Sequence, residues 1–307
     1  MVDAQVGTPA VGDHQSIAPT GGPAADHTLW NGSMATTQPP PEYVDDEPGE
    51  TCPVAETVPG FDAFPLSPDA PDDLAGQISA GIAGAAPWAW IARIAVTYTD
   101  GSTATYSGWL ASPRVVGTCG LCLFDPSRGA AKEATVELAA GVVGATRRSL
   151  VSKEFRIVQG WAKETKPECD YGAIVLPDKG FADIGHFGLV WLPGSRPRGE
   201  PLNLAGYAAD RAEGLLWFET FHATDVGERI LHRMSGFHSS PAGAPIWLCL
   251  SRGGRVQRFV CGLVGSNVDR GDALRLHRDI YSNFRAWVEE AAKSPPASPI
   301  APPAPTA

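Results

Sequence analysis

The chain contains no histidine between His27 and His186, a gap that covers about half of its 307 residues. Imidazole is the side chain whose ordinary pKa best suits proton transfer near neutral pH, and it is also a common metal ligand. Chemistry that needs an imidazole must therefore draw on the first 27 residues or on the later histidines, which are His186, His222, His232, His238 and His277.

Lysine and arginine are absent from the first 92 residues, although 13 of the 34 acidic residues lie there. The rest of the chain carries the other 21 acidic residues against 24 basic ones, so the acidity behind the formal net charge of -10 belongs to the N-terminal segment. Neither part has the basic stripe that binds nucleic acid, and we expect no nucleic-acid partner.

Long apolar runs are also absent, since no stretch reaches the roughly 18 apolar residues of a membrane-spanning helix. The N-terminus has neither a basic start nor an apolar centre, so we expect no standard signal peptide and no membrane attachment. The six cysteines permit disulfides without requiring them. The sequence therefore leaves two cellular locations open: the cytoplasm, or an exported state reached by a non-standard route.

Two segments have low-complexity composition. Residues 1–85 are rich in proline, glycine, alanine and acid, and such a sequence buries too little apolar surface to offset the entropy cost of ordering. Residues 293–307 form a tail that repeats proline and alanine. We expect most of the first segment to be disordered and residues 86–292 to form the folded domain.

Short strand patterns fill the predicted domain. Residues 93–98 alternate, and Asp100-Gly101 predicts a hairpin turn into residues 103–111. A later hairpin is predicted to join residues 246–250 to 256–264. Further strands are predicted at residues 135–138, 155–158, 172–176, 188–192, 202–207 and 215–221.

Only at the C-terminal end of the domain does the spacing of apolar residues change from the strand pattern to a helical one. One helical face there is apolar, and it consists of Ile280, Phe284, Trp287, Val288 and Ala291. Many short strands followed by one helix predict an all-β barrel or sandwich of roughly 200 residues.

Three segments, in order, resemble the catalytic segments of trypsin-like serine peptidases, nearest to the bacterial glutamyl endopeptidases. Residues 108–122 resemble the strand and turn that end in the family's Thr-Ala-Ala-His-Cys. Residues 169–176 resemble the strand that begins with the family's orienting aspartate. Residues 240–247 resemble the turn that contains the family's Gly-Asp-Ser-Gly-Gly-Pro.

The resemblance implies an all-β fold of two antiparallel six-stranded β-barrels with a C-terminal helix. The first barrel would span about residues 86–193, the second about 199–278, and the helix about 279–292. In the family, the first barrel supplies the general base and the acid, and the second supplies the nucleophile and the substrate pocket, so that the active site lies in the cleft between them.

The resemblance places Leu121 at the position of the base, Asp170 at that of the acid and Ala242 at that of the nucleophile. Leucine cannot accept a proton and alanine has no atom that attacks a carbonyl, so only the acid remains of the triad. Loss of base or nucleophile lowers turnover on the order of a million-fold in such enzymes. The histidine gap makes this conclusion independent of the exact alignment, and we expect a catalytically inactive homologue.

Other positions implied by the resemblance are altered as well. The oxyanion hole maps to Ser240 and Ala242, and Pro241 between them restricts the backbone. Val264 stands at the candidate position for a histidine of the glutamyl endopeptidases, so glutamate selectivity is not expected. The remaining positions expected to line the cleft or its pocket are Phe237, His238, Gly265 and Ser266.

Two groups of residues suggest other chemistry. Cys119 and Cys122 flank Leu121 and would allow a Cys-assisted endopeptidase, but buried small residues or disulfide partners are the simpler interpretation. His238-Ser239-Ser240 resembles a nucleophile with its base, yet adjacent residues rarely have triad geometry. The cysteine pair also lacks a well-spaced second pair of ligands, so we expect no metal and no cofactor.

Two structural roles are predicted as well. Asp170 is expected to accept hydrogen bonds from backbone N–H groups, which would favour the aspartate without any histidine. Cys249 and Cys261 lie on the two strands of the later hairpin and could form a disulfide, although the sequence does not determine the register. The family's usual bridge from the Cys122 position has no partner, because Tyr106-Ser107 occupies the other strand.

The preferred hypothesis is a protein of this fold without hydrolytic activity that binds a peptide or protein in the interbarrel cleft by strand addition to the second barrel. Its own acidic N-terminal segment is a candidate occupant of that cleft. The alternatives are an active serine-type or Cys-assisted endopeptidase with nonstandard residues, and a structural or regulatory partner whose cleft is vestigial.

Overall fold

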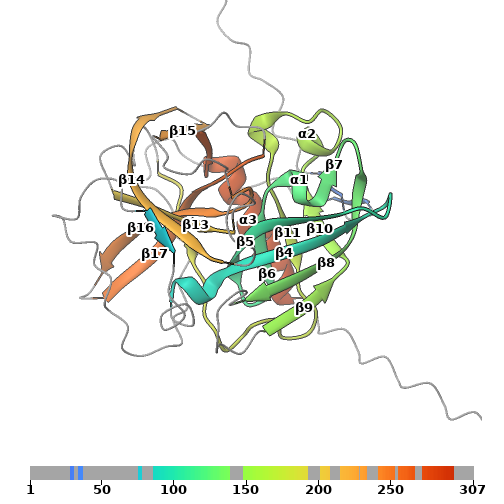
Figure 1. Cartoon of the computed structure of the whole chain (residues 1–307), viewed down its shortest axis with the longest axis horizontal. Helices are drawn as coiled ribbons and strands as arrows, with labels where there is room; N and C mark the ends of the chain where they lie inside the picture. The colour runs from blue at the N-terminus through green and yellow to red at the C-terminus, as the bar shows by residue number, and fades with distance from the viewer. Residues whose placement is uncertain are drawn as a thin grey trace, which may run out of the picture.

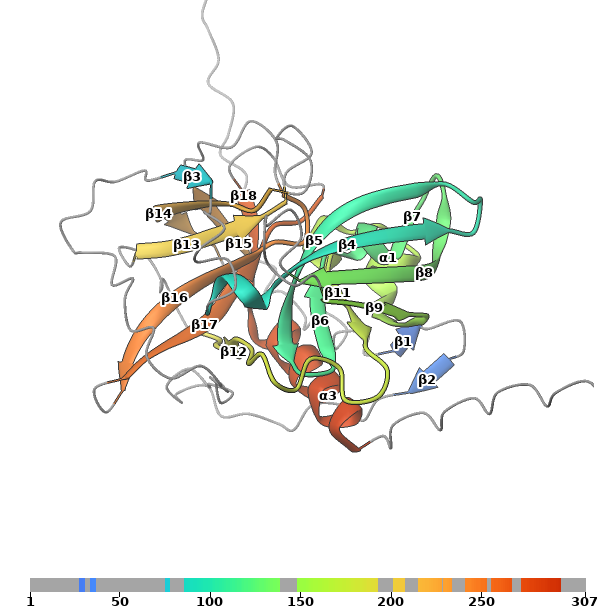
Figure 2. The same cartoon turned by 60° about the horizontal axis from the view of Figure 1, so that its bottom comes forward.

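The computed structural model describes residues 28–30, 34–36, 75–77, 86–138, 148–192, 201–207, 215–227, 229–233, 241–252, 255–266 and 272–293. Two curled sheets lie side by side, and a long helix at the C-terminal end of the described chain packs against them (Figures 1 and 2). Apart from the short strand β3 (Ala75–Gln77), the strands of the first sheet precede those of the second in sequence.

The first sheet is antiparallel and follows the order β10-β11-β6-β5-β4-β8-β7, with β9 paired to β8. The predicted hairpin between β4 and β5 is confirmed. Its turn places Gly101 at φ +87°, and the Asp100 carboxylate accepts the Ser102 N–H at 2.8 Å. The strands are β4 Ile91–Tyr98, β5 Thr103–Ser112, β6 Val115–Thr118, β7 Phe124–Asp125, β8 Gly129–Leu138, β9 Arg148–Ser152, β10 Glu154–Ile157 and β11 Gly172–Val175.

The second sheet follows the order β12-β17-β16-β13-β14-β15-β18, and an additional pairing of β17 with β18 closes it. Its later hairpin, β16 with β17, lies where the sequence predicts it. The strands are β12 Gly188–Leu189, β13 Pro201–Gly206, β14 Trp217–Val226, β15 Ile230–Arg233, β16 Pro245–Arg252, β17 Arg255–Leu263 and β18 Asp272–Arg275.

These two curled sheets and the terminal helix confirm the predicted all-β fold class. Each sheet contains eight strands rather than six, because short segments pair at the edges. One of them, β12, runs parallel to β17, with Gly188 opposite Phe259. Strand pairing of the second sheet therefore starts upstream of residue 193, where the first barrel was predicted to end.

Three short strands lie within the acidic N-terminal segment. β1 (Thr28–Trp30) and β2 (Met34–Thr36) pair with each other, and β3 (Ala75–Gln77) pairs antiparallel with β14, placing Ala75 opposite Glu219. The other positions of residues 1–85, for which disorder was predicted, lie outside the described residues. The segment thus adds one strand to the second sheet (Figure 2).

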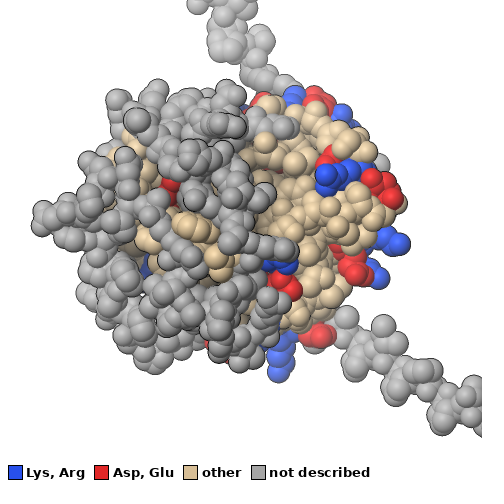
Figure 3. All heavy atoms as spheres, viewed as in Figure 1, with Lys and Arg blue, Asp and Glu red and all other residues tan. Residues whose placement is uncertain are grey.

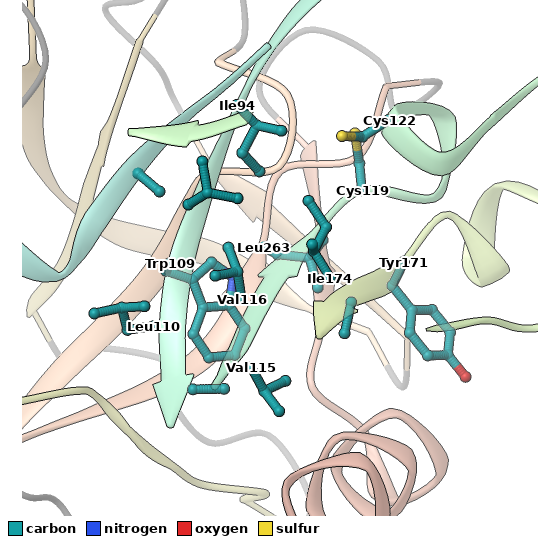
Figure 4. Packing of buried hydrophobic residues seen from close by; sticks show 14 of the residues in the cluster. Ile94, Trp109, Leu110, Val115, Val116, Cys119, Cys122, Tyr171, Ile174 and Leu263 are labelled. Atoms are coloured by element: carbon teal, nitrogen blue, oxygen red, sulfur yellow. The ribbon is translucent and has the colours of Figure 1, made fainter. Parts of the chain in front are cut away.

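A continuous apolar core joins the two sheets to the helix. Trp109 from β5 is fully buried, and its ring lies 6.5 Å from that of Phe187 and 5.2 Å from that of Phe284. Phe187 in turn lies 5.3 Å from Trp247 of β16. Figure 4 shows Trp109 among the β-branched side chains of this core. Because both sheets contribute to it, the relative position of the two barrels is fixed by packing.

The terminal helix α3 (Arg278–Lys293) carries the predicted apolar stripe, of which Ile280, Phe284, Trp287 and Ala291 are buried. Arg156 ties the helix to the first sheet, since this buried guanidinium lies 2.8 Å from Glu290 and 2.7 Å from Glu154. The short helices are η1 Trp88–Trp90, α1 Gly120–Leu123, α2 Gln159–Ala162 and η2 Pro167–Cys169.

Acidic and basic side chains alternate over the described part of the surface in Figure 3. Neither sign forms a continuous patch on that face. In the part of the chain that the structure describes, no helix is both long and apolar enough to cross a membrane.

Candidate functional site

Leu121, at the predicted base position, is the second residue of α1, which follows β6. Leu121 is partly exposed, and both of its backbone groups are held by hydrogen bonds. Its N–H donates to Asp170 Oδ1 at 2.9 Å, and its carbonyl accepts the Tyr98 hydroxyl at 2.9 Å. The Tyr98 hydroxyl also lies 2.8 Å from that of Tyr106. These hydrogen bonds form a buried polar network that holds the backbone around Leu121 in place.

Asp170 follows η2 and is fully buried. Besides the Leu121 bond, its Oδ2 accepts both the N–H and the hydroxyl of Ser266, each at 2.5 Å. The prediction that this carboxylate accepts backbone N–H groups is confirmed. Burial raises the pKa of Asp170, and the hydrogen bonds from Ser266, Leu121 and Gly120 oppose that rise.

The turn that carries the nucleophile position is held by both sheets. Ser107 of β5 donates its N–H to the Ala242 carbonyl at 2.9 Å, while Gly243 donates to the Val264 carbonyl at 2.7 Å. Ala244 closes the turn by donating to the Pro241 carbonyl at 2.9 Å. Ala242 itself is partly exposed, whereas its neighbours Pro241 and Gly243 are buried.

Gly243 lies where the first sheet comes closest to this turn. Its φ is +86°, and a Cβ at this position would lie 2.2 Å from the Ser107 carbonyl oxygen and 2.5 Å from Thr118 Oγ1. Those two atoms already hydrogen-bond each other at 2.8 Å. The Ser107 hydroxyl also accepts the N–H of Tyr207, which follows β13, at 2.9 Å. Only glycine fits both the conformation and the space.

The two cysteines beside Leu121 are fully buried. Burial raises the pKa of Cys119 well above its ordinary value, and the nearby Asp170 raises it further. Burial likewise raises the pKa of Cys122 to about 12. Reactive cysteines are exposed and have low pKa values, so these two thiols are poor nucleophiles.

Three described histidines, His186, His222 and His277, lie outside the three segments that resemble catalytic segments. His186 hydrogen-bonds to the Phe187 carbonyl at 2.9 Å, and burial lowers its pKa. His222 is exposed on β14. His277 is buried just before α3, where burial and the nearby Arg229 lower its pKa to about 4. None of these three takes the place of the missing base on α1.

The positions predicted to line the cleft or its pocket differ in burial, and some lie outside the described residues. Val264 is fully buried within the apolar core of the second sheet, and its place in the cleft or its pocket stays a prediction. Gly265 is buried, and Ser266 is partly exposed. Phe237, His238 and Ser240 lie outside the described residues.

Ser266 has a role that the sequence-based interpretation missed. It was assigned only to the cleft, yet it supplies two of the hydrogen bonds to Asp170. The available signal was its place two residues after Val264, just beyond the end of β17. Periodicity could not reveal a contact between residues 96 positions apart in sequence.

No disulfide joins Cys249 to Cys261 in the structure, so the predicted bridge is wrong. The strand register places Cys249 opposite Arg258, and a bulge between Ile246 and Trp247 displaces Cys261 from direct pairing. Cys249 is exposed whereas Cys261 is buried. The two cysteines are thus several positions out of register on the paired strands, too far apart for a bridge.

Among the residues that the structure describes, no group of three or more histidine, cysteine or acidic side chains is arranged to hold a metal ion. The expectation of no cofactor stays a prediction.

Two curated bacterial proteins are similar to the chain in sequence. One, named extracellular metalloprotease, from Bacillus subtilis, is 24% identical over 208 residues, covering 66% of this chain and 65% of that protein. The other, a glutamyl endopeptidase from Bacillus licheniformis, is 25% identical over 206 residues, covering 64% of each. The chain thus spans slightly less than two thirds of the length of these relatives. No family model matches the chain.

Solved structures are similar in fold. A Glu endopeptidase in complex with MPD superposes with a TM-score of 0.57 at 15% identity, covering 71% of this chain and 98% of that one. A protease from Arthrobacter nicotinovorans gives 0.54 at 17% identity, covering 69% and 100%. A thermostable serine protease from an extremophilic microorganism gives 0.53 at 16% identity, covering 67% and 98%. The chain has the trypsin-like serine protease fold, and the resemblance to glutamyl endopeptidases is confirmed.

Proposed function

We propose that this homologue of trypsin-like serine proteases is catalytically inactive and binds a peptide or protein segment in the cleft between its barrels. The observation that carries the proposal is chemical: leucine stands at the base position and alanine at the nucleophile position. Neither side chain transfers a proton or attacks a carbonyl. The burial of both neighbouring thiols argues against the alternative of a Cys-assisted endopeptidase.

The local chemistry favours binding over hydrolysis. Leu121 and Ala242 are both partly exposed, and both pack against the core cluster that joins the two sheets. They present apolar surface where an enzyme would present its base and nucleophile. Apolar pocket walls bearing few polar groups are typical of binding sites. We therefore expect the ligand to place a small or medium apolar side chain against these two residues.

Strand addition would hold such a ligand. Within the chain, β3 of the N-terminal segment pairs with β14 of the second sheet, with residues 75–77 opposite residues 217–219. This pairing is itself a strand added to the sheet, the mode that many peptide-binding domains use, and it supports strand addition as the binding mode. Occupancy of the cleft by the N-terminal segment stays a prediction.

The full chain is expected to show no turnover of casein and no covalent labelling by a fluorophosphonate probe. The double variant Leu121→His with Ala242→Ser should recover little activity, because Pro241 still restricts the turn that would form the oxyanion hole. Turnover of the unmodified chain that disappears on one Ser or Cys substitution would establish the endopeptidase alternative. Strong turnover of the double variant would show that the turn is competent.

Binding is tested by selection of a peptide library on the full chain. We expect enrichment of peptides with an apolar residue at one fixed position, and a loss of at least about tenfold in affinity when Ala242→Arg fills the cleft with charge. Val151→Arg is the matched control, because Val151 is an exposed apolar residue on β9, outside the catalytic segments. Equal binding by both variants, or no enrichment at all, would contradict the proposal.

A further inference from the structure

Cys119 and Cys122 occupy a single turn of the chain. Cys119 caps the N-terminus of α1 in an extended conformation, with φ -75° and ψ 156°, and Cys122 lies three residues on within the helix. Residues three apart in a helical turn have Cα atoms separated by roughly 5 Å. A disulfide requires a Cα separation of about 4.4–6.8 Å. The backbone of this turn therefore suits a bridge between the two residues.

The two thiols also share one buried environment. Neither cysteine has any exposed surface, and Figure 4 shows their sulfur atoms together beside α1. Each lies close enough to the Thr118 hydroxyl and to Asp170 for both groups to affect its pKa, and Cys122 acts on Cys119 in the same way. Both cysteines are free thiols in the structure, and each lies within electrostatic range of the other.

The other described cysteines occupy different places. Cys169 is partly exposed at the end of η2, Cys261 is buried in the second core, and Cys249 is exposed on β16. Cys119 and Cys122 are the pair that sequence proximity and packing bring together within the described part of the chain.

We propose that Cys119 and Cys122 form an intraturn disulfide when the chain folds in the presence of a thiol oxidant such as glutathione disulfide. One cysteine thiolate attacks the glutathione disulfide, forming a mixed disulfide and releasing one glutathione. The second cysteine thiolate then attacks the protein sulfur of that mixed disulfide and releases the other glutathione. In total, two protein thiols are oxidised to one disulfide and one glutathione disulfide is reduced to two glutathione molecules. The inference does not depend on whether the cleft binds a peptide.

The structure indicates when this oxidation takes place. Both thiols are inaccessible in the folded chain, and burial raises the pKa of each, so few thiolates meet an external oxidant. In the unfolded chain the same residues are exposed and lie three positions apart, which favours ring closure. We therefore expect the bridge to form during folding and to be slow to form or break afterwards.

The bridge would stabilise the turn that presents Leu121. It would link the end of β6 to α1 around Leu121, whose N–H bonds to Asp170. A short closed loop removes a modest amount of entropy from the unfolded chain. We expect the oxidised protein to melt about 5 °C above the reduced protein.

Trypsin provides a direct assay, because residues 115–128 form one tryptic peptide that contains these two cysteines and no others. The full chain is refolded with reduced and oxidised glutathione, alkylated in denaturant and digested without reduction. We expect this peptide to be unalkylated and two hydrogen masses lighter than its dithiol form. The same treatment of protein that was folded reduced and only then exposed to glutathione disulfide should leave the peptide doubly alkylated.

Three variants test whether the mass loss comes from a bridge between Cys119 and Cys122. Cys119→Ser and Cys122→Ser should each abolish the mass loss, and Cys169→Ser, the matched control, should retain it. A peptide alkylated twice after oxidative refolding would overturn the proposal, as would its cross-link to a peptide carrying another cysteine. If a serine variant fails to fold, the wild-type peptide masses from the two folding orders still decide the question.

Discussion

Replacement of Gly243 by alanine is expected to lower the free energy of unfolding by about 2–5 kcal/mol. The positive φ of +86° costs an L-residue roughly 1–2 kcal/mol. The added Cβ would also lie 2.2 Å from the Ser107 carbonyl oxygen, a backbone atom that cannot rotate away. Relief of this overlap requires the two sheets to separate locally, and overpacking of this kind costs about 1–3 kcal/mol.

Gly101→Ala is the matched control for this prediction. Gly101 has nearly the same φ, +87°, but a Cβ there would meet no atom within 4 Å. This variant should lose only about 1–2 kcal/mol, the conformational part of the effect. Equilibrium unfolding in urea, followed by tryptophan fluorescence, measures both variants. Equal losses would show that the contact between the turn and the first sheet is looser than the structure indicates.

Asp170→Asn is expected to destabilise the protein by about 2–3 kcal/mol, although it changes no side-chain volume. Both carboxylate oxygens accept hydrogen bonds, Oδ1 from Leu121 and Oδ2 from Ser266. An amide has only one acceptor oxygen, so its NH₂ group must face a backbone N–H in either orientation. Because the site is fully buried, no water can relieve the mismatch.

Two further variants serve as comparisons for Asp170→Asn: Ser266→Ala removes one of its hydrogen-bond donors, and Asp183→Asn makes the same change at an exposed aspartate. Ser266→Ala removes the hydroxyl donor but keeps the N–H donor, and we expect a loss of about 1–2 kcal/mol. Asp183 pairs with Arg148 on the surface with its side chain 73% exposed, so its replacement should change stability little. The measurement is again the urea midpoint of each variant. A neutral Asp170→Asn substitution would mean that Asp170 is a relic of the triad without a structural role.

These two predictions connect stability to the proposed loss of catalysis. A triad acid is useful to an enzyme because it orients a histidine. Here the same carboxylate is satisfied by Leu121 and Ser266, which come from the two different sheets. Asp170 therefore has a structural reason to be present in a chain without a base, since it links the base-position turn to the end of β17.

Several features of the fold could be predicted from the sequence because they depend on neighbours along the chain. Alternation over residues 93–98 and the Asp100-Gly101 turn predict the first hairpin, since side-chain direction and turn geometry are local properties. The apolar stripe of α3 is predicted for the same reason. The strands β6, β9, β15 and β18 are not among the predicted strands, because segments of four or five residues carry little periodic signal.

The sequence by itself determined which functional groups stand at the predicted triad positions. The chain has no histidine from residue 28 to residue 185, and the predicted base and nucleophile positions hold leucine and alanine, which neither accept a proton nor attack a carbonyl. The tertiary structure alone decided three further points. It buried Val264 in the second core, placed Cys249 opposite Arg258 rather than Cys261 through the strand register, and brought Ser266 to Asp170 across 96 residues. These outcomes depend on strand register and on packing between distant segments, which no local pattern specifies.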